Sequence, residues 1–329
     1  ILDPGIGSGI LGIALVERIV EDFKSIEHIH LVGYEMDSGL KSLLHESIEQ
    51  LEKWAASKRV ILTYEIRFKD FVLDKAPVLD DSPSLFSALQ QTEKEELFDI
   101  IISNPPYFKI PKDDPRARAA AKVVYGQPNI YALFMAISAK LLKQDGELIF
   151  ITPRSYASGP YFKSFREFFF EEIIPLQFHL FNSRTEAFDR DSILQENLIL
   201  HAKKASKSAP DKKVTISFSK GSRDLGSVKS RKLPIKRIID LSSTNKILFL
   251  PTADEEDRIL DIVDSWSGSL HKYGMEISTG KVVPFRATDF LCTHGDIGNG
   301  EAPLIWMNSI RNSTVVWPFL KRSKPQYIR

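Results

Sequence analysis

The first two hundred residues alternate between short apolar segments and longer segments whose apolar residues recur at helical spacing. Strand-like runs fall at His30–Tyr34, Val60–Phe68 and Phe98–Ser103. Helical runs separate them, and the clearest covers Ser38–Ser57. Parallel strands need such crossovers, because the chain must return to the same end of the sheet before the next strand begins. The alternation therefore predicts an α/β, Rossmann-like parallel sheet with helices on both faces.

The same periodicities place the remaining elements. Further strands are expected at Ile1–Leu2, Glu147–Thr152, Pro175–Phe181 and Leu194–Ala202. Further helices are expected over Ser8–Phe23, Asn129–Leu142, Tyr161–Phe170 and Ala253–Trp266. The polar stretch Asp74–Glu96 is expected to be an inserted loop.

The helical periodicity fades after Lys203, where Ser, Gly, Pro and basic residues become frequent, apart from the segment Ala253–Trp266. Such a change of composition between periodic segments is typical of a linker between domains. We therefore expect one domain at residues 1–205, a linker at 206–240 and the start of a second domain at 241–329.

The expected linker is strongly basic, although the net charge of the whole chain is only +1. Between Lys203 and Arg237 there are twelve Lys or Arg residues and two Asp or Glu residues. Basic side chains in such a stretch can neutralise DNA phosphates, and the candidates are Lys229, Arg231 and Lys232. The alternative is a solvated surface linker that binds nothing.

The composition excludes several classes of protein. No uninterrupted apolar run approaches the ~18 residues of a membrane-spanning helix, so no membrane partner is expected. The single cysteine, Cys292, excludes an internal disulfide framework and a cysteine-rich zinc site, and fits a reducing cytoplasm. The histidines show no ligand spacing, so no metal site is expected. The chain begins at Ile1, within its first motif, which indicates a fragment without its N-terminal segment.

Two features at strand ends could hold a nucleotide-like cofactor. The segment Leu2–Gly9 is a glycine-rich turn between a strand and a helix, where the backbone can approach a ligand and the helix N-terminus favours an anion. Glu35 ends the next strand, and an acidic residue there can accept hydrogen bonds from both hydroxyls of a ribose. The alternatives are a simple tight turn at the glycines and a helix cap, a role that Asp37 suits well.

A third candidate is Asp70-Phe71, which follows the strand-like run Val60–Phe68. The carboxylate of Asp70 could accept a hydrogen bond from an adenine amine, and the ring of Phe71 could pack on the base. The alternative is a surface aspartate beside a core phenylalanine.

The motif Asn104-Pro105-Pro106-Tyr107 follows directly on the apolar run Phe98–Ser103. Two prolines after a buried strand fix an extended loop in which neither proline has a free N–H. The side-chain oxygen of Asn104 and the carbonyl of Pro105 are then preset acceptors for the two hydrogens of an amine, and they localise its lone pair. Tyr107 offers a face on which a base can stack. The motif therefore predicts chemistry on an exocyclic amine such as N6 of adenine.

With these motifs in this order, the chain resembles the adenine-N6 DNA methyltransferases whose cofactor motif precedes the catalytic motif. The resemblance covers about residues 1–204 and implies a seven-stranded fold that binds S-adenosylmethionine (SAM). Family members carry a further SAM-contacting segment before the first motif, which this chain lacks. The resemblance implies a cofactor site built from the residues Asp3, Pro4, Gly5, Gly7, Glu35, Met36, Asp70 and Phe71.

Later segments also resemble this family. Phe188, shortly before Gln195–Leu200, is similar to the aromatic that stacks on the flipped target base, and core packing is the alternative. The segments Ile277–Arg286, Pro303–Trp306 and Val316–Phe319 resemble the start of the target-recognition region in restriction–modification methyltransferases. They are similar to those of a PstI-like or BsuBI-like relative. The resemblance therefore implies a second, C-terminal DNA-recognition domain that is incomplete in this chain.

The function that the resemblance implies is site-specific methylation of double-stranded DNA at adenine N6, with SAM as cofactor. A cognate restriction endonuclease, fused or separate, is an expected partner. One alternative is methylation of protein glutamine or RNA, because Asn-Pro-Pro-Tyr also serves those acceptors. The other is a non-catalytic DNA-binding specificity protein. The basic flank favours DNA, and the intact motif Asn104–Tyr107 favours catalysis.

Overall fold

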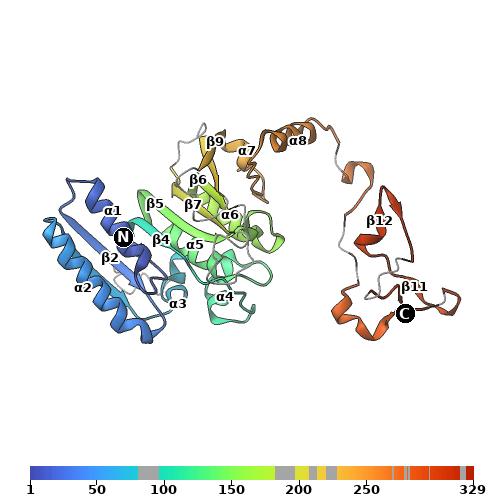
Figure 1. Ribbon diagram of the computed structural model, residues 1–329, viewed down its shortest axis with the longest axis horizontal. Helices are drawn as coiled ribbons and strands as arrows, with labels where there is room; N and C mark the ends of the chain where they lie inside the picture. Colours follow the sequence, from blue (N-terminus) through green and yellow to red (C-terminus); the bar gives the residue numbers. More distant parts are fainter. Residues whose placement is uncertain are drawn as a thin grey trace. The chain divides into compact units, whose positions relative to one another are not determined.

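A nine-stranded sheet forms the centre of the first compact unit, Ile1–Leu260, in the order β3-β2-β1-β4-β5-β7-β6-β8-β9 (Figure 1). The computed structural model describes residues 1–80, 96–181, 197–206, 213–219, 228–268, 270–277, 280, 282–295, 297–318 and 324–329. The strands are β1 (Leu2–Asp3), β2 (His28–Tyr34), β3 (Ile61–Arg67), β4 (Phe98–Ser103), β5 (Leu142–Pro153), β6 (Ile173–Phe181), β7 (Asn197–Lys204), β8 (Lys213–Ser219) and β9 (Lys229–Pro234).

The sheet is mostly parallel, and its exceptions lie toward one edge. Neighbouring strands from β3 to β5 run parallel, as do β6 and β8. Strand β7 lies between β5 and β6 and is antiparallel to both, and β9 is antiparallel to β8. The expected α/β parallel sheet is therefore confirmed, with two strands more than the expected seven among the described residues.

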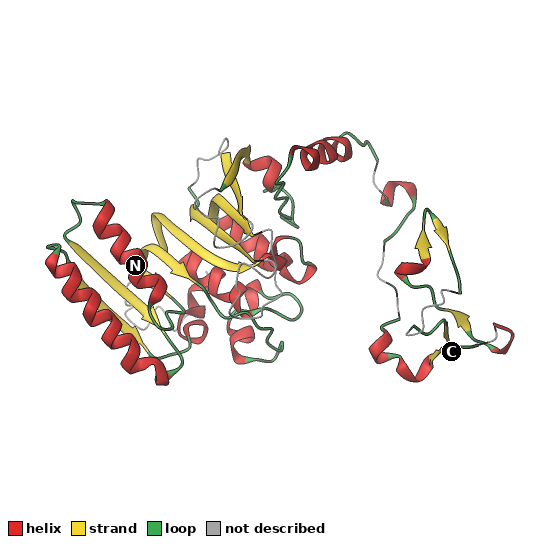
Figure 2. Cartoon of the chain, in the orientation of Figure 1, coloured by secondary structure: helices red, strands yellow, loops and turns green. Residues whose placement is uncertain are grey.

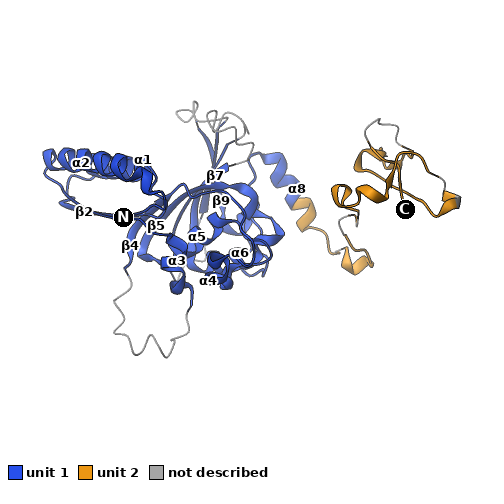
Figure 3. Cartoon of the chain, turned by 90° about the horizontal axis from the view of Figure 1, so that it is seen from below, with its two compact units in different colours: residues 1–260 blue, residues 261–329 orange. Residues whose placement is uncertain are grey.

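Helices cover both faces of the sheet (Figures 2 and 3). Those of the first unit are α1 (Ile10–Asp22), α2 (Lys41–Ser57), α3 (Phe71–Lys75), α4 (Pro115–Ala119), α5 (Ile130–Lys140), α6 (Lys163–Glu172) and α7 (Ile235–Ile238). On one face, α1 and α2 bury residues such as Val16 and Leu44. On the other, α5 and α6 enclose a larger core, and α5 is buried from Ile130 to Ala139, as its nearly continuous apolar sequence requires.

The segment expected to be a basic linker instead contributes strands β8 and β9 to the sheet. Strand β8 buries Val214 and Ile216, which alternate with Thr215 and Ser217, and it pairs with the edge of β6. Strand β9 has few apolar residues because it lies at the edge of the sheet, where basic side chains oppose further pairing. The structure accordingly differs from the boundaries expected at 205 and 240.

The chain divides into two compact units, Ile1–Leu260 and Asp261–Arg329 (Figure 3). The division falls within α8 (Asp254–Asp264), close to the helix expected over Ala253–Trp266. No described helix combines the length and the apolar character that crossing a membrane requires.

The second unit is built from very short strands. Its two small sheets contain β10 (Leu291–Cys292), β14 (Tyr327–Ile328) and β11 (Ala302–Pro303) in one, and β12 (Ile310–Arg311) and β13 (Thr314–Val315) in the other. Two indoles fasten it internally. Trp306 Nε1 donates to the carbonyl of Pro325 at 2.7 Å, and Trp317 Nε1 donates to the carbonyl of Gln326 at 3.1 Å.

Candidate cofactor and catalytic site

A cavity of about 300 Å³ lies where β1, β2 and β4 end and the following loops begin. Its wall contains residues from all of the predicted motifs together with three that the sequence did not assign to the site. The predicted residues are Pro4, Gly5, Glu35, Met36, Phe71, Asn104 and Pro106, and the additional ones are Tyr34, Lys69 and Phe134. In a parallel sheet the carboxyl ends of adjacent strands form one such crevice.

The glycine-rich turn brings the first motif against the catalytic one. A side chain built on Gly5 would place its Cβ 3.5 Å from Ser103 Oγ and 3.9 Å from the carbonyl oxygen of Asn104. Gly7 has a φ of 54°, in the left-handed region, and nothing lies within 4 Å of the position of a Cβ. The turn therefore combines a backbone shape that favours glycine with open space for a ligand.

Asp3 is a buried carboxylate at the base of this turn. One of its oxygens accepts from the backbone N–H of Gly5 at 3.2 Å, and the other, Oδ2, has no hydrogen-bond partner in the described structure. Burial raises the pKa of Asp3 to about 7, and the negative charge of Glu35 acts in the same direction. Asp3 is 1% exposed and is not among the residues lining the cavity, although its neighbours Pro4 and Gly5 are. A donor or cation that reached Oδ2, such as the amino group of the expected cofactor, would satisfy it.

Glu35 is held at the cavity by two backbone donors. Its Oε2 accepts from the N–H of Gly7 at 3.0 Å, and its Oε1 accepts from the N–H of Asp37 at 2.7 Å. Asp37 in turn caps the short helix η1 (Ser38–Leu40) by accepting from Gly39 N at 2.8 Å. The two acidic residues thus divide the two roles that the sequence left open: Asp37 is the cap, and Glu35 lines the cavity.

Asp70 and Phe71 occupy different surroundings. Asp70 Oδ1 caps α3 by accepting from Leu73 N at 3.0 Å, and Asp70 is not among the residues lining the cavity. Phe71 lines the cavity and is 1% exposed. Its ring centroid lies 5.1 Å from those of both Tyr34 and Phe134. These aromatic contacts hold a flat apolar surface in place for a ligand.

Arg116 connects Asp70 with the loop after the catalytic motif. It donates to Asp114 through Nε at 2.9 Å and Nη2 at 2.6 Å, and its Nη1 lies 3.9 Å from Asp70 Oδ2. Asp114 also caps α4 by accepting from the backbone N–H of Arg116. The guanidinium lies 5.7 Å from the ring centroid of Phe108. The Arg116 guanidinium therefore faces two carboxylates, pairing closely with Asp114 and at longer distance with Asp70.

The catalytic motif leaves β4 with Asn104 exposed and Tyr107 half-buried. The single hydrogen of the Tyr107 hydroxyl faces two acceptors, Asn104 Oδ1 and, at 2.8 Å, the carbonyl of Ile151. The Tyr107 ring is edge-on to Tyr131, with centroids 6.2 Å apart. Burial raises the pKa of Tyr107 above its usual range, and Tyr131 adds to the effect, so the hydroxyl remains protonated. The oxygen expected to receive a substrate amine thus already has a donor.

The basic candidates of β9 are not equivalent. Lys229 and Lys232 are exposed. Arg231 Nη2 donates to Asp254 at 2.7 Å and to Asp257, while its Nη1 donates to the carbonyl of Ala253 at 2.9 Å. Arg231 thereby joins β9 to the start of α8. Phe188, the other expected base contact, lies outside the described residues.

A group of possible metal ligands comes from β2, β3 and the residues just before β4. Atoms of His30, Glu65 and Glu96 lie within 4.8 Å of one another. Arg67 donates to both Glu65 oxygens and to Glu96, and this pairing lowers the pKa of Glu65. Because the guanidinium already compensates these carboxylates, we assign no metal to them.

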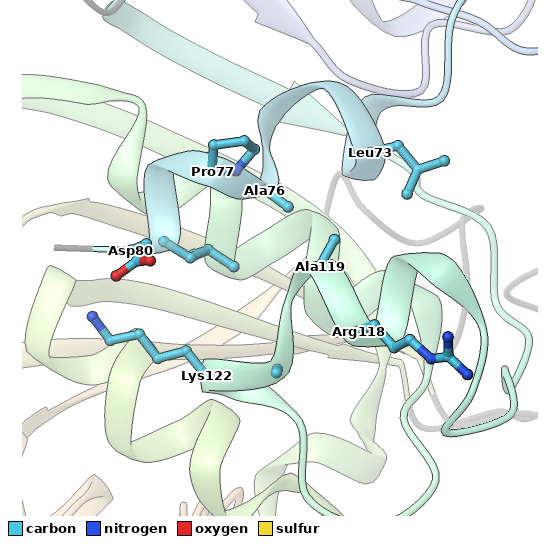
Figure 4. Close-up of a pocket in the computed structure, with 9 residues that line it drawn as sticks. Leu73, Ala76, Pro77, Asp80, Arg118, Ala119 and Lys122 are labelled. Carbon is cyan, nitrogen blue, oxygen red and sulfur yellow. The ribbon is translucent and has the colours of Figure 1, made fainter. Parts of the chain in front are cut away.

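A second hollow of about 510 Å³ lies between α3 with η2 (Ala76–Leu79) and α4 with η3 (Ala121–Val123) (Figure 4). Its walls are mainly apolar. Figure 4 shows the amine of Lys122 reaching toward Asp80, whereas the guanidinium of Arg118 extends away from both. None of the predicted motif residues lines this hollow, so the chemistry is assigned to the smaller cavity.

Comparisons with known proteins agree with this geometry. Residues 25–188 match the family described as Eco57I restriction-modification methylase. The chain is 29% identical over 328 residues to the type II methyltransferase M.PstI of Providencia stuartii, covering 99% of this chain and 61% of that protein. It is 29% identical over 329 residues to the type II methyltransferase M.BsuBI of Bacillus subtilis, covering 100% of this chain and 62% of that protein. The expected resemblance is confirmed.

The fold has a counterpart among solved structures. One from a type I restriction-modification system aligns with a TM-score of 0.50 and 12% identity, covering 80% of this chain and 60% of that one. At this identity the likeness concerns the fold alone. The chain spans about three fifths of the length of the two curated relatives.

Proposed function

Because residues 25–188 match the Eco57I restriction-modification methylase family, we propose that the protein methylates adenine N6 in DNA. One observation carries the proposal. The cofactor-type residues Gly5, Glu35 and Phe71 line the same cavity as Asn104 and Pro106. A methyl donor held by the first group therefore lies beside the acceptors for an amine.

The residues around the cavity fit SAM. Asp3 offers an unpartnered buried oxygen in the described structure, and Gly7 leaves open space beside the backbone. Glu35 presents a fixed carboxylate for ribose hydroxyls, and Phe71 supplies an apolar face for the adenine. When bound, SAM supplies a methyl group activated by its positively charged sulfonium. Met36 and Pro4 complete the proposed contacts with it.

The catalytic loop prepares the attacking amine. The target adenine must leave the duplex, because its N6 is paired there. Asn104 Oδ1 and the Pro105 carbonyl then accept the two N6 hydrogens, Pro106 keeps the loop extended, and the faces of Tyr107 and Phe188 hold the base. No side chain needs to remove a proton before attack, because the amine becomes acidic only after methylation. Catalysis consists mainly of positioning and polarisation.

The remaining proposals concern the surroundings of this reaction. Residues 261–329, the second compact unit, belong to a target-recognition region, and double-stranded DNA is the macromolecular substrate. The proposed protein partner is a restriction endonuclease, fused or separate. The named relatives are type II methyltransferases, and such an enzyme would protect DNA from cleavage by that endonuclease. The free Cys292 is compatible with the cytoplasm, which is the compartment we propose.

The two alternative functions are not favoured. Methylation of protein glutamine or RNA would use the same Asn104 oxygen, but the named relatives are type II methyltransferases. A non-catalytic specificity protein has no need of a catalytic motif lining a cavity with the cofactor residues.

The test is methylation of unmethylated DNA by the intact protein with labelled SAM, followed by detection of N6-methyladenine. We expect Asn104→Ala to bind SAM normally and to lose activity about a hundredfold or more, as for removal of one preset polar contact to a transition state. Label appearing on cytosine, protein or RNA, or near-normal turnover by a folded Asn104→Ala protein, would contradict the proposal.

A further inference from the structure

The segment Lys109–Lys122, which follows the catalytic motif and includes α4, carries a local excess of positive charge and is called the loop here. Between Lys109 and Lys122 there are five Lys or Arg residues and two Asp residues. The loop begins two residues after Tyr107, so it borders the place where a target nucleotide would enter. Exposed cations at that position are suited to bind a polyanion.

The loop is fastened to the protein core, so these charges have fixed positions. Ile110 is 1% exposed, and its N–H donates to the carbonyl of Pro128 at 3.0 Å. The N–H of Ile130 donates to the carbonyl of Phe108 at 3.0 Å. With Ile110 turned into the core, the alternating backbone leaves the Lys109 side chain exposed.

Two acidic groups in or beside the loop are already engaged by Arg116. Asp114 and Asp70 both face Arg116, and Asp113 is the exposed acid that remains in the loop. The side chains of Lys109, Lys112 and Arg118 are exposed and make no ion pair with the described residues. Figure 4 shows the Arg118 guanidinium extending outward from α4. Three cations are therefore available to a partner.

Strand β9 is less suited to the same partner, although it is also basic. Arg231 is bound by Asp254 and Asp257, two of the four consecutive acidic residues that begin α8. These carboxylates reduce the positive potential around Lys229 and Lys232 and repel phosphates.

We propose that Lys109, Lys112 and Arg118 bind the sugar–phosphate backbone of DNA next to the target adenine. This inference rests on the proposed function and replaces β9 with the loop as the DNA contact of this unit. Cations that follow Asn104 in the chain hold the phosphates flanking the nucleotide that enters the catalytic loop. Such interactions set the position of the duplex and do not read its sequence.

The experiment measures the dissociation constant of the intact protein for a short fluorescent duplex over about 50–200 mM salt. One variant carries Lys109→Gln, Lys112→Gln and Arg118→Gln, and the matched variant carries Lys229→Gln and Lys232→Gln. The slope of log affinity against log salt becomes shallower by about 0.9 for each phosphate that the protein no longer neutralises. We expect the slope of the loop variant to be shallower by about 2.7, and the β9 variant to keep the wild-type slope.

SAM affinity and the thermal unfolding midpoint monitor folding, and both should match wild type in the loop variant. Should the triple variant misfold, each single substitution should still make the slope shallower by about 0.9. The inference is overturned if the salt dependence of the loop variant equals that of wild type, or if only the β9 variant has a shallower slope. It is also overturned if the loop variant methylates a different DNA sequence. Failure of the proposed function is distinguishable, because then the wild-type protein itself leaves DNA unmethylated.

Discussion

The hydroxyl of Tyr107 and a substrate amine require the same oxygen of Asn104. Tyr107→Phe frees this oxygen while keeping the ring, whereas Tyr107→Ala also removes the stacking face. A neutral hydrogen bond contributes about 0.5–1.5 kcal/mol, so we expect the Phe variant to stay within about tenfold of wild type. The Ala variant should be slower by about a hundredfold or more. Single-turnover methylation measures both. Equal effects in the two variants would assign the catalytic role to the hydroxyl instead.

Asp3 gives the cavity a dependence on pH. Its folded pKa of about 7 lies above the ordinary value near 3.8. The folded state therefore holds a proton that the unfolded state has released, and stability contributed by Asp3 falls as pH rises from about 4 to 7, then levels off. In the proposed site the charged form of Asp3 would pair with the SAM ammonium, so SAM affinity should rise by about 25-fold between about pH 5.5 and 7.5.

Calorimetric titration with SAM across this pH range tests the role of Asp3. The control is Asp3→Asn, which keeps the shape and removes the titration, so its weaker SAM affinity should not vary with pH. The same variant should resist thermal unfolding better than wild type above pH 7, where the wild-type carboxylate is charged. A pH dependence that persists in Asp3→Asn would locate the titrating group elsewhere.

Among the elements, those with strong periodicity could be predicted from the sequence. Strand β4 matches its prediction at both ends, and α1 lies within the helix expected over Ser8–Phe23. Strands β8 and β9 were wrongly expected to be a linker, because basic composition hides a strand that lies near a sheet edge. The alternation of Val214 and Ile216 with polar residues was the signal that would have identified β8.

The site was predictable to the extent that it consists of local motifs. The cavity is lined by Glu35 and Asn104, and each follows a strand-like apolar run that can be recognised in the sequence. Tyr34, Lys69 and Phe134 could not be assigned, because their approach to the cavity depends on which strands and helices become neighbours. The sequence left open whether Asp70 contacts a ligand or is a surface residue, and its role as a cap depends on the geometry of α3.

Arg231 joins β9 to the start of α8 through its bonds to Asp254 and Asp257. Arg231→Gln leaves Asp257, which is 17% exposed, without its cationic partner. We expect the free energy of unfolding to fall by about 2 kcal/mol, because the bond to a charged group is removed and the carboxylate stays partly buried. Urea denaturation measures this. Lys232→Gln, which removes the same charge from the same strand, is the control and should change stability by less than about 0.5 kcal/mol.

At the scale of the whole molecule, the catalytic unit extends beyond the boundary expected at residue 205. We expect a fragment of residues 1–266 to unfold cooperatively and to bind SAM, because it keeps β8, β9 and α8. A fragment of residues 1–205 lacks the strand that pairs with β6 and should unfold at lower temperature or aggregate. Thermal unfolding and SAM titration of the two fragments test this prediction. Equal stability would show that the last two strands are dispensable.

The strand order also has a consequence for the time at which the sheet can form during synthesis. Strand β6 leaves the ribosome before either of its neighbours, because β7 and β8 both follow it in the chain. The nascent protein can complete the half containing β1 to β5 while Ile173–Phe181 still has no partner. This apolar strand is thus exposed to misassembly until Lys204 has emerged, and the rate of translation across the intervening residues sets the length of that exposure.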